Sequence, residues 1–350
     1  MVVWRRTGFF AALLLLATLG ACGSSRDVVA GGARARMIET DTIRMRILEQ
    51  GSGPLVLLLH GFPGLSHVWH HQLAALAAAG YHAVAPDMRG YGGTEAPAAV
   101  EAYDMFEVSA DVIALMDALG EESAVLVGHD WGAFVAWSAA LIYPERFRRL
   151  VAISVPFSGR GDQPPLEAMR AAAGDNFNYV VYYQEPGVAE AEFDPDPRAL
   201  FERVFVSPGQ ELEPPTIQSP AAGAGGLLGR LGRARELPAW FSEADMRLFV
   251  ETFARTGFRG GLNYYRALDR TFHRSAHLAG ATVDLPVLFL GGERDLLLGG
   301  ASQEDLRAVM APVVRDLEVV LYPDAGHWVA LERAADVNAA ILGFLRSGAR

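Results

Sequence analysis

The 350-residue chain contains no lysine, and all 30 of its basic residues are arginine. Mechanisms that need a lysine amine are therefore excluded, among them the P-loop phosphate cradle, a pyridoxal Schiff base and a lysine-dependent aldolase. Cysteine is almost as scarce, because Cys22 is the only one. An internal disulfide, a cysteine-rich zinc site and an iron–sulfur cluster are excluded in turn. Catalysis would have to rest on Asp, Glu, His, Ser and Tyr side chains, and we expect neither a cofactor nor a metal.

Basic residues are fewer than acidic ones, 30 against 41, and the formal net charge is −11. This balance argues against nucleic acid as a partner. Apolar residues make up 51% of the chain. Length and composition together suit one or two domains with a sizeable buried core.

The longest apolar run lies near the N-terminus, where residues 8–21 carry no charge and follow Arg5 and Arg6. A basic start, a short apolar run and small residues are typical of a secretory signal, whereas a membrane-spanning helix needs about 20 apolar residues. We therefore predict a signal peptide over residues 1–21. Residues 22–36 show no packing pattern and are expected to form a flexible tether.

The end of the apolar run resembles the lipobox of bacterial lipoproteins, since it reads Leu19-Gly20-Ala21-Cys22. The resemblance implies that Cys22 becomes lipidated and anchors the protein to a bacterial membrane, because several acyl chains together bind a membrane firmly. The alternatives are a plain signal peptide with a chance cysteine, which predicts a periplasmic or secreted protein, and an uncleaved anchor. The expected location is the cell envelope.

Six short apolar runs bounded by turn residues predict buried β-strands, at residues 54–59, 81–85, 123–127, 150–155, 285–290 and 317–322. Stretches of helical character lie between most of them, at residues 69–79, 106–119, 133–142, 303–310 and 334–345. This alternation predicts an α/β fold with a mostly parallel sheet covered on both faces. Residues 38–49 alternate in polarity and predict antiparallel strands at the start.

The strand–helix alternation stops after Pro156 and resumes near Leu285. We predict that residues 157–280 form a mainly helical cap, inserted after the sixth strand. The core is then made of residues 37–156 and 281–350. Residues 207–232 are rich in Gly, Pro and Ala and are expected to loop over the surface.

An aspartate stands where a strand–turn–helix would present a nucleophile. The sequence GHDWG at residues 128–132 joins an apolar strand to a small-residue helix, so glycines flank Asp130 two positions away on each side. This is the spacing of the nucleophile elbow, which needs small neighbours because strand and helix approach closely there. The alternative is an ordinary turn in which Asp130 caps the helix.

Three further segments extend the pattern. HGFPG at residues 60–64 follows the first strong strand, and its Phe62 N–H could form an oxyanion hole with the N–H of Trp131. The alternative is a simple turn. Asp295 and His327 follow the last two strands. Nucleophile, acid and histidine in this chain order indicate the α/β-hydrolase fold.

An aspartate nucleophile selects a different reaction from a serine. Carboxylate attack on an ester or amide would give a high-energy anhydride, whereas displacement at an sp³ carbon gives an alkyl ester on Asp130. Water activated by His327 and oriented through Asp295 would then attack the carbonyl of that ester. Epoxides and carbon–halogen compounds both fit. A halide needs N–H donors, whereas an epoxide oxygen needs a proton donor such as a tyrosine hydroxyl.

Several motifs together resemble the α/β-hydrolase-fold epoxide hydrolases, most closely the soluble type. They are HGFPG at 60–64, GHDWG at 128–132, YYQEPGVAEAE at 182–192, GFRGGLNYYR at 257–266 and AGHW at 325–328. The resemblance implies that two cap tyrosines, Tyr179 and Tyr265, hold and protonate the epoxide oxygen. Tyr182, Tyr183 and Tyr264 are then packing residues. Spacing alone does not choose among the five.

Two other functions remain open at this point. A haloalkane or haloacid dehalogenase could use the same triad, although Asn commonly stands there in the place of Phe62, whose side chain cannot donate to a halide. A non-catalytic, lipid-anchored protein could bind a hydrophobic ligand under the cap, although the intact triad argues against it. The Phe- and Tyr-rich cap predicts a small apolar epoxide as the substrate.

Overall fold

A computed structural model describes residues 27–28 and 32–347. The predicted signal peptide over residues 1–21 and the predicted lipidation site Cys22 lie outside the described residues. Among the described residues, no helix combines the length and the apolar character needed to cross a membrane.

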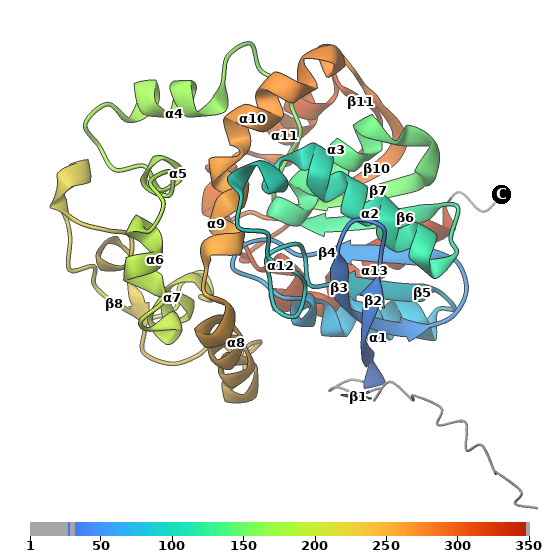
Figure 1. Ribbon diagram of the computed structural model, residues 1–350, viewed down its shortest axis with the longest axis horizontal. Helices are drawn as coiled ribbons and strands as arrows, with labels where there is room; N and C mark the ends of the chain where they lie inside the picture. The colour runs from blue at the N-terminus through green and yellow to red at the C-terminus, as the bar shows by residue number, and fades with distance from the viewer. Residues whose placement is uncertain (1–26, 29–31, 348–350) are drawn as a thin grey trace, which may run out of the picture.

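A nine-stranded sheet forms the centre of the molecule, in the order β1-β2-β3-β5-β4-β6-β7-β10-β11 (Figure 1). The neighbours from β1 to β5 pair antiparallel, and those from β5 to β11 pair in parallel. The strands are β1 (Asp27–Val28), β2 (Arg34–Glu39), β3 (Arg44–Gly51), β4 (Leu55–Leu59), β5 (His82–Pro86), β6 (Ala124–His129), β7 (Phe147–Ile153), β10 (Val283–Gly292) and β11 (Val314–Tyr322). The α/β fold expected from the sequence is confirmed.

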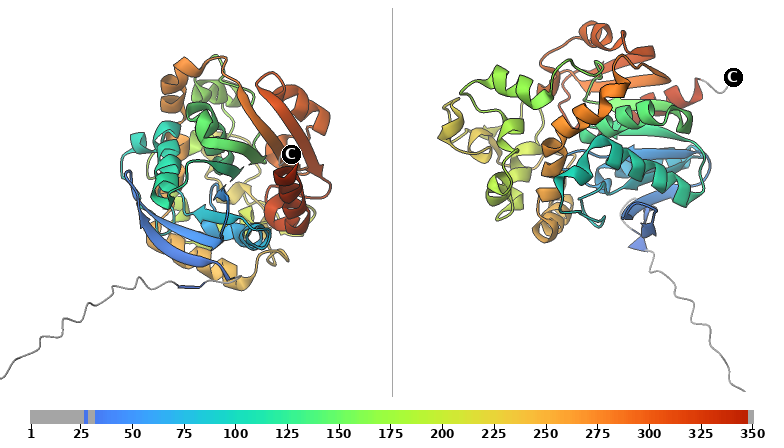
Figure 2. Two further views of the ribbon diagram at one scale, coloured as in Figure 1. Left: turned by 90° about the vertical axis from the view of Figure 1, so that its right-hand side faces the viewer. Right: turned by 45° about the horizontal axis from the view of Figure 1, so that its top comes forward.

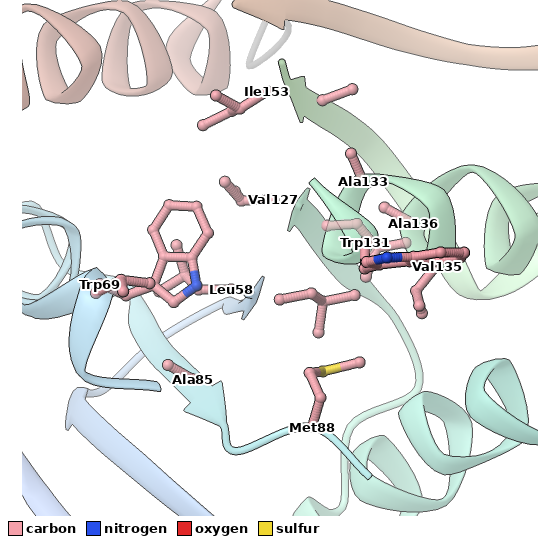
Figure 3. Close-up of a cluster of buried hydrophobic side chains, with 14 of the residues drawn as sticks. Leu58, Trp69, Ala85, Met88, Val127, Trp131, Ala133, Val135, Ala136 and Ile153 are labelled. Carbon is pink, nitrogen blue, oxygen red and sulfur yellow. The ribbon is translucent and has the colours of Figure 1, made fainter. Parts of the chain in front are cut away.

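The central strands are apolar along their whole length because helices cover both faces of the sheet. Every residue of β4 and β6 is buried. Figure 3 shows Leu58, Val127 and Ile153 of β4, β6 and β7 in one buried cluster, with Trp69 on one side and Ala133 and Ala136 of α3 on the other. Figure 2 shows the two helical layers. They contain α1 (His70–Ala78) and α13 (Ala334–Arg346) on one face, and α2 (Met105–Leu119) and α3 (Trp131–Ile142) on the other.

The prediction of a tether over residues 22–36 is wrong at its C-terminal end. β2 begins at Arg34, and β1 pairs with it at residues that were expected to be flexible. The segment has no apolar run, so composition alone gives no packing signal. Its order comes from the ladder with β3 and from a bidentate ion pair between Arg36 and Glu49, at 2.9 and 3.1 Å. Such cross-strand pairs stabilise a sheet without burying apolar surface.

A helical cap lies between β7 and β10, at the carboxyl ends of the parallel strands (Figures 1 and 2). A small two-stranded sheet of β8 (Leu212–Glu213) and β9 (Arg233–Ala234) interrupts it. Its helices are α4 (Pro165–Ala173), α5 (Tyr179–Tyr182), α6 (Val188–Phe193), α7 (Pro197–Val204), α8 (Glu243–Thr256), α9 (Arg259–Arg266) and α10 (Leu268–Arg274). Three helices of the core follow the cap: α11 (Gln303–Met310), α12 (Val329–Glu332) and α13 (Ala334–Arg346).

Asp104 joins the cap to the core. Its carboxylate caps α2 by accepting the N–H of Phe106 at 3.0 Å. It also accepts hydrogen bonds from Arg270 and Arg274 of α10, each at 2.7 Å. Because the Asp104 side chain is fully buried, these charge-assisted bonds fix the last cap helix at a defined place on the core.

Candidate active site

Asp130 stands on a strained turn between β6 and α3. Its backbone φ is 54° and its ψ is −121°, a conformation that costs a non-glycine residue on the order of 1–3 kcal/mol. Glycine at position 132 permits this turn, because a side chain there would collide with the backbone of Leu59. The strain and the close approach are those of a nucleophile elbow.

Backbone N–H groups surround the Asp130 carboxylate. The N–H of Phe62 donates to Oδ1 at 2.7 Å, and the adjacent N–H of Trp131 helps to stabilise the charged carboxylate. Burial raises the pKa of Asp130, and the charge of His327 with these two N–H donors opposes the rise. The two donors predicted to form an oxyanion hole therefore converge on the predicted nucleophile.

The loop that carries Phe62 is held by His60. Nδ1 of His60 donates to the carbonyl of Gly61 at 2.9 Å, and Nε2 accepts the N–H of Met88 at 3.0 Å. The histidine is buried, which lowers its pKa. Its neutral form supplies the one donor and the one acceptor that this arrangement needs.

The structure brings His327 and Asp295 together with Asp130. Nδ1 of His327 donates to Asp295 Oδ2 at 3.0 Å, and Nε2 lies 3.8 Å from Asp130 Oδ2. Burial opposes the charged form of both His327 and Asp295. The hydrogen bond and the mutual attraction outweigh it, so the pKa of His327 is raised and that of Asp295 is lowered. Nε2 of His327, the predicted base, thus faces Asp130, the predicted nucleophile.

Two residues that the sequence did not single out support the backbone of His327. Its carbonyl oxygen accepts hydrogen bonds from His129 Nε2 at 2.8 Å and from Ser154 Oγ at 3.1 Å. Burial, followed by the charge of His327, lowers the pKa of His129 to about 3, so His129 is neutral. His129 could have been identified from the sequence, because it lies inside the GHDWG motif. Ser154 could not, because no motif indicates its contact with His327.

Tyr179 and Tyr265 belong to an aromatic cluster that includes Phe62 and Trp131. The ring centroids of the two tyrosines are 6.0 Å apart, and Tyr265 packs edge-on against Trp131 at 4.8 Å and Phe62 at 5.7 Å. Burial and then the negative charge of Asp130 raise the pKa of Tyr179 to about 12 and that of Tyr265 well above its usual value. Both hydroxyl groups therefore keep their protons at neutral pH and can donate them.

The hydroxyl groups of the five cap tyrosines divide into two sets. Tyr182 donates to Glu192 at 2.9 Å, and Tyr264 donates to the carbonyl of Arg89 at 3.1 Å. Within residues 32–347, the hydroxyls of Tyr179, Tyr183 and Tyr265 have no such partner. Geometry thus removes two of the five candidates.

The segments that carry Tyr179 and Tyr265 are tied together inside the cap. Gln184 donates to the carbonyl of Val180 at 2.8 Å and to that of Tyr265 at 3.1 Å. Arg266 forms a bidentate ion pair with Glu190 at 2.8 and 2.9 Å. Gln184 therefore joins α5 to α9, and the bidentate pair, which adds geometric precision as well as energy, joins α9 to α6.

No group of three or more His, Cys, Asp or Glu side chains is arranged to hold a metal ion among the residues that the structure describes. His67 instead pairs with Asp245 of α8 at 2.6 Å, and its ring stacks on that of His70. These histidines form a contact between core and cap.

Comparison with known proteins gives concordant matches. Residues 54–205 match the family model described as alpha/beta hydrolase fold. The chain is 43% identical over 322 residues to Epoxide hydrolase A of Mycobacterium tuberculosis, a match that covers 90% of this chain and 98% of the relative. It is 38% identical over 320 residues to Epoxide hydrolase 1 of Siraitia grosvenorii, covering 88% and 97%.

Solved structures agree with the sequence matches. The crystal structure of Epoxide Hydrolase A from Mycobacterium thermoresistibile superposes with a TM-score of 0.83 at 44% identity, covering 90% of this chain and 98% of the other. An epoxide hydrolase from an endophytic Streptomyces gives 0.82 at 38% identity, covering 90% and 95%. Because each match covers 90% of this chain, the unmatched part is shorter than the segment between β7 and β10, and both matches therefore include part of the cap as well as the core.

Proposed function

Because this chain belongs to the α/β-hydrolase-fold epoxide hydrolases and is itself an epoxide hydrolase, we propose that its reaction passes through an alkyl ester on Asp130. The observation that carries this proposal is the carboxylate at the elbow. Asp130 accepts the N–H of Phe62 at 2.7 Å and lies 3.8 Å from Nε2 of His327. Its charge acts on Tyr179 and Tyr265, whose hydroxyls have no partner among the described residues.

In the first half-reaction, a carboxylate oxygen of Asp130 attacks one epoxide carbon. The ring C–O bond breaks, and its electron pair stays on the epoxide oxygen. The hydroxyl groups of Tyr179 and Tyr265 hold that oxygen, and one of them transfers its proton to the developing alkoxide. Their raised pKa values keep these protons in place until the alkoxide, a stronger base, forms.

In the second half-reaction, Nε2 of His327 takes a proton from water as the oxygen attacks the Asp130 carbonyl carbon. Asp295 holds the histidine and stabilises its cationic form. The N–H groups of Phe62 and Trp131 stabilise the oxyanion of the tetrahedral intermediate. Collapse breaks the bond to the alkyl oxygen, which takes the proton from His327, and a vicinal diol leaves. The second proton of the water remains on the Asp130 carboxyl and passes to the tyrosinate left by the first half-reaction, which restores the starting site.

Replacing Asp130 with Ala is expected to abolish diol formation, because no other carboxylate occupies the elbow. Purified protein would be given aryl and alkyl epoxides and, in parallel, haloalkanes, and both diol and halide would be measured. Diol production that persists in the Asp130→Ala protein would contradict the proposed nucleophile. Halide release without diol would instead assign the site to carbon–halogen chemistry.

We further propose that the substrate is a small apolar epoxide. Support comes from the aromatic side chains around the reacting group, because Phe62, Trp131, Tyr179, Tyr183 and Tyr265 contact one another as ring pairs. Such a lining favours apolar ligands, with few polar groups to fix their orientation.

Export and lipid anchoring through Cys22 are also proposed, on the basis of the Leu19-Gly20-Ala21-Cys22 sequence and the preceding apolar run. Expression in a bacterium should give a membrane-bound protein whose mature N-terminal Cys22 carries acyl chains in mass spectrometry. The Cys22→Ser protein should lose this modification. An unmodified mature N-terminus in the parent protein would contradict the proposal.

A further inference from the structure

A third carboxylate, that of Glu332 at the end of α12, accepts hydrogen bonds from the backbone on both sides of His327. Its Oε2 accepts the N–H of Gly326 at 2.9 Å, and its Oε1 accepts the N–H of Trp328 at 3.0 Å. These are the residues immediately before and after the histidine. The half-buried Glu332 side chain therefore fixes the peptide units that carry His327.

The loop has a second set of restraints on its other side, where the carbonyl of His327 accepts from His129 and Ser154. The backbone at His327 is consequently held by side chains from β6, from the end of β7 and from α12. Of these three supports, only Glu332 can carry a negative charge. Burial raises the pKa of Glu332, and its two N–H bonds and the charge of His327 oppose the rise. Glu332 contributes both a geometric restraint and an electrostatic one.

The charge on Glu332 matters most in the second half-reaction. The titratable groups that act on His327 are Asp295, Asp130, Glu332 and the neutral His129, and the three carboxylates all raise the pKa of His327. Once Asp130 is esterified it is neutral and no longer raises that pKa. Asp295 and Glu332 are then the carboxylates left to keep His327 basic while it takes a proton from water.

We propose that Glu332 is a positioning residue for the hydrolytic half-reaction, which holds the His327 loop in place and keeps a carboxylate beside it after Asp130 is alkylated. The inference rests on the proposed roles of Asp130 and His327. It adds no new chemical step, because Glu332 contacts only the backbone and the reacting atoms are those described above.

The Glu332→Gln substitution separates this role from a general effect on folding. Glutamine has the same shape, but its one carbonyl oxygen can accept from only one of the two N–H groups, and its charge is gone. We expect alkylation of Asp130 to stay within about twofold of the parent, while hydrolysis of the ester slows by about 10–100-fold, as misplacement of a catalytic group does.

The pH dependence gives the more specific readout. Hydrolysis requires neutral His327, so its rate rises with pH through the pKa of that residue. Removing a negative charge lowers this pKa, and the acidic limb of the Glu332→Gln profile should move to lower pH. The Glu332→Asp protein keeps the charge but shortens the reach, so its limb should return toward the parent position while hydrolysis stays slow.

The experiment mixes full-length protein in excess with an epoxide, quenches the mixture at intervals and follows the ester by mass spectrometry across a range of pH. Glu304→Gln, on the exposed surface of α11, serves as the control and should match the parent. Parent-like ester hydrolysis in Glu332→Gln would overturn the inference. The inference would also be overturned if both half-reactions slowed equally and the acidic limb of the Glu332→Gln pH profile stayed at the parent position. A parent protein that never forms the ester would instead refute the proposed function.

Discussion

The His327→Gln protein is expected to consume one equivalent of epoxide and then stop, with the substrate held as an ester on Asp130. Its first half-reaction needs Asp130 and the tyrosines but no base, so alkylation should remain within several-fold of the parent. Its second half-reaction loses the group that activates water, which costs about 10²–10⁴-fold. Intact-protein mass spectrometry should show a mass increase equal to that of the epoxide, and digestion should place it on the peptide that contains Asp130.

The matched control is His273→Gln, because His273 is exposed on α10. It should form diol at the parent rate. The assignment of His327 as the base would be refuted by continued turnover of the His327→Gln protein. Failure of that protein to become alkylated would also count against it, since the first half-reaction would then depend on His327.

The second large effect is expected when Tyr179 and Tyr265 are both replaced with Phe. The alkoxide that forms on ring opening then has no proton donor, and loss of general acid catalysis should lower the alkylation rate by about 10²–10⁴-fold. Each single substitution should cost less, because the remaining hydroxyl still holds the oxygen. Single-turnover quenching, with ester and diol measured separately, checks the result.

Tyr182→Phe and Tyr183→Phe are the controls for the tyrosine pair. Tyr182 shares α5 with Tyr179 but binds Glu192 through its hydroxyl, so its loss should leave alkylation nearly unchanged. Tyr183 packs 5.0 Å from Tyr265, and its hydroxyl has no partner among the described residues. An alkylation defect in Tyr183→Phe as large as that in Tyr179→Phe or Tyr265→Phe would transfer the role to Tyr183.

Local patterns in the sequence were sufficient to predict the core of this fold. The all-apolar strands before Asp130 and HGFPG, together with the glycines around Asp130, specify a strand–turn–helix without knowledge of distant contacts. Asp130, Asp295 and His327 each follow a predicted parallel strand, so the sequence also predicts that they lie at the same edge of the sheet. The structure places these three residues within one site.

Features that depend on contacts between distant segments could not be predicted in the same way. The choice among five cap tyrosines required a family resemblance, because hydroxyl partners such as Glu192 and Arg89 become visible only in the folded cap. The β2 strand was missed because its order depends on pairing with β3 rather than on its own composition. Ser154 and Glu332 act on His327 through backbone contacts that have no sequence motif.

The most direct test of the central claim is a single turnover in water enriched in oxygen-18, with the enzyme in excess. Hydrolysis of an ester at the Asp130 carbonyl carbon puts the new oxygen into the carboxylate, while the diol receives an oxygen that the enzyme already held. We predict unlabelled diol and oxygen-18 in the peptide that contains Asp130. Labelled diol from the first turnover, with an unlabelled Asp130 peptide, would show direct attack of water on the epoxide and would contradict the covalent mechanism.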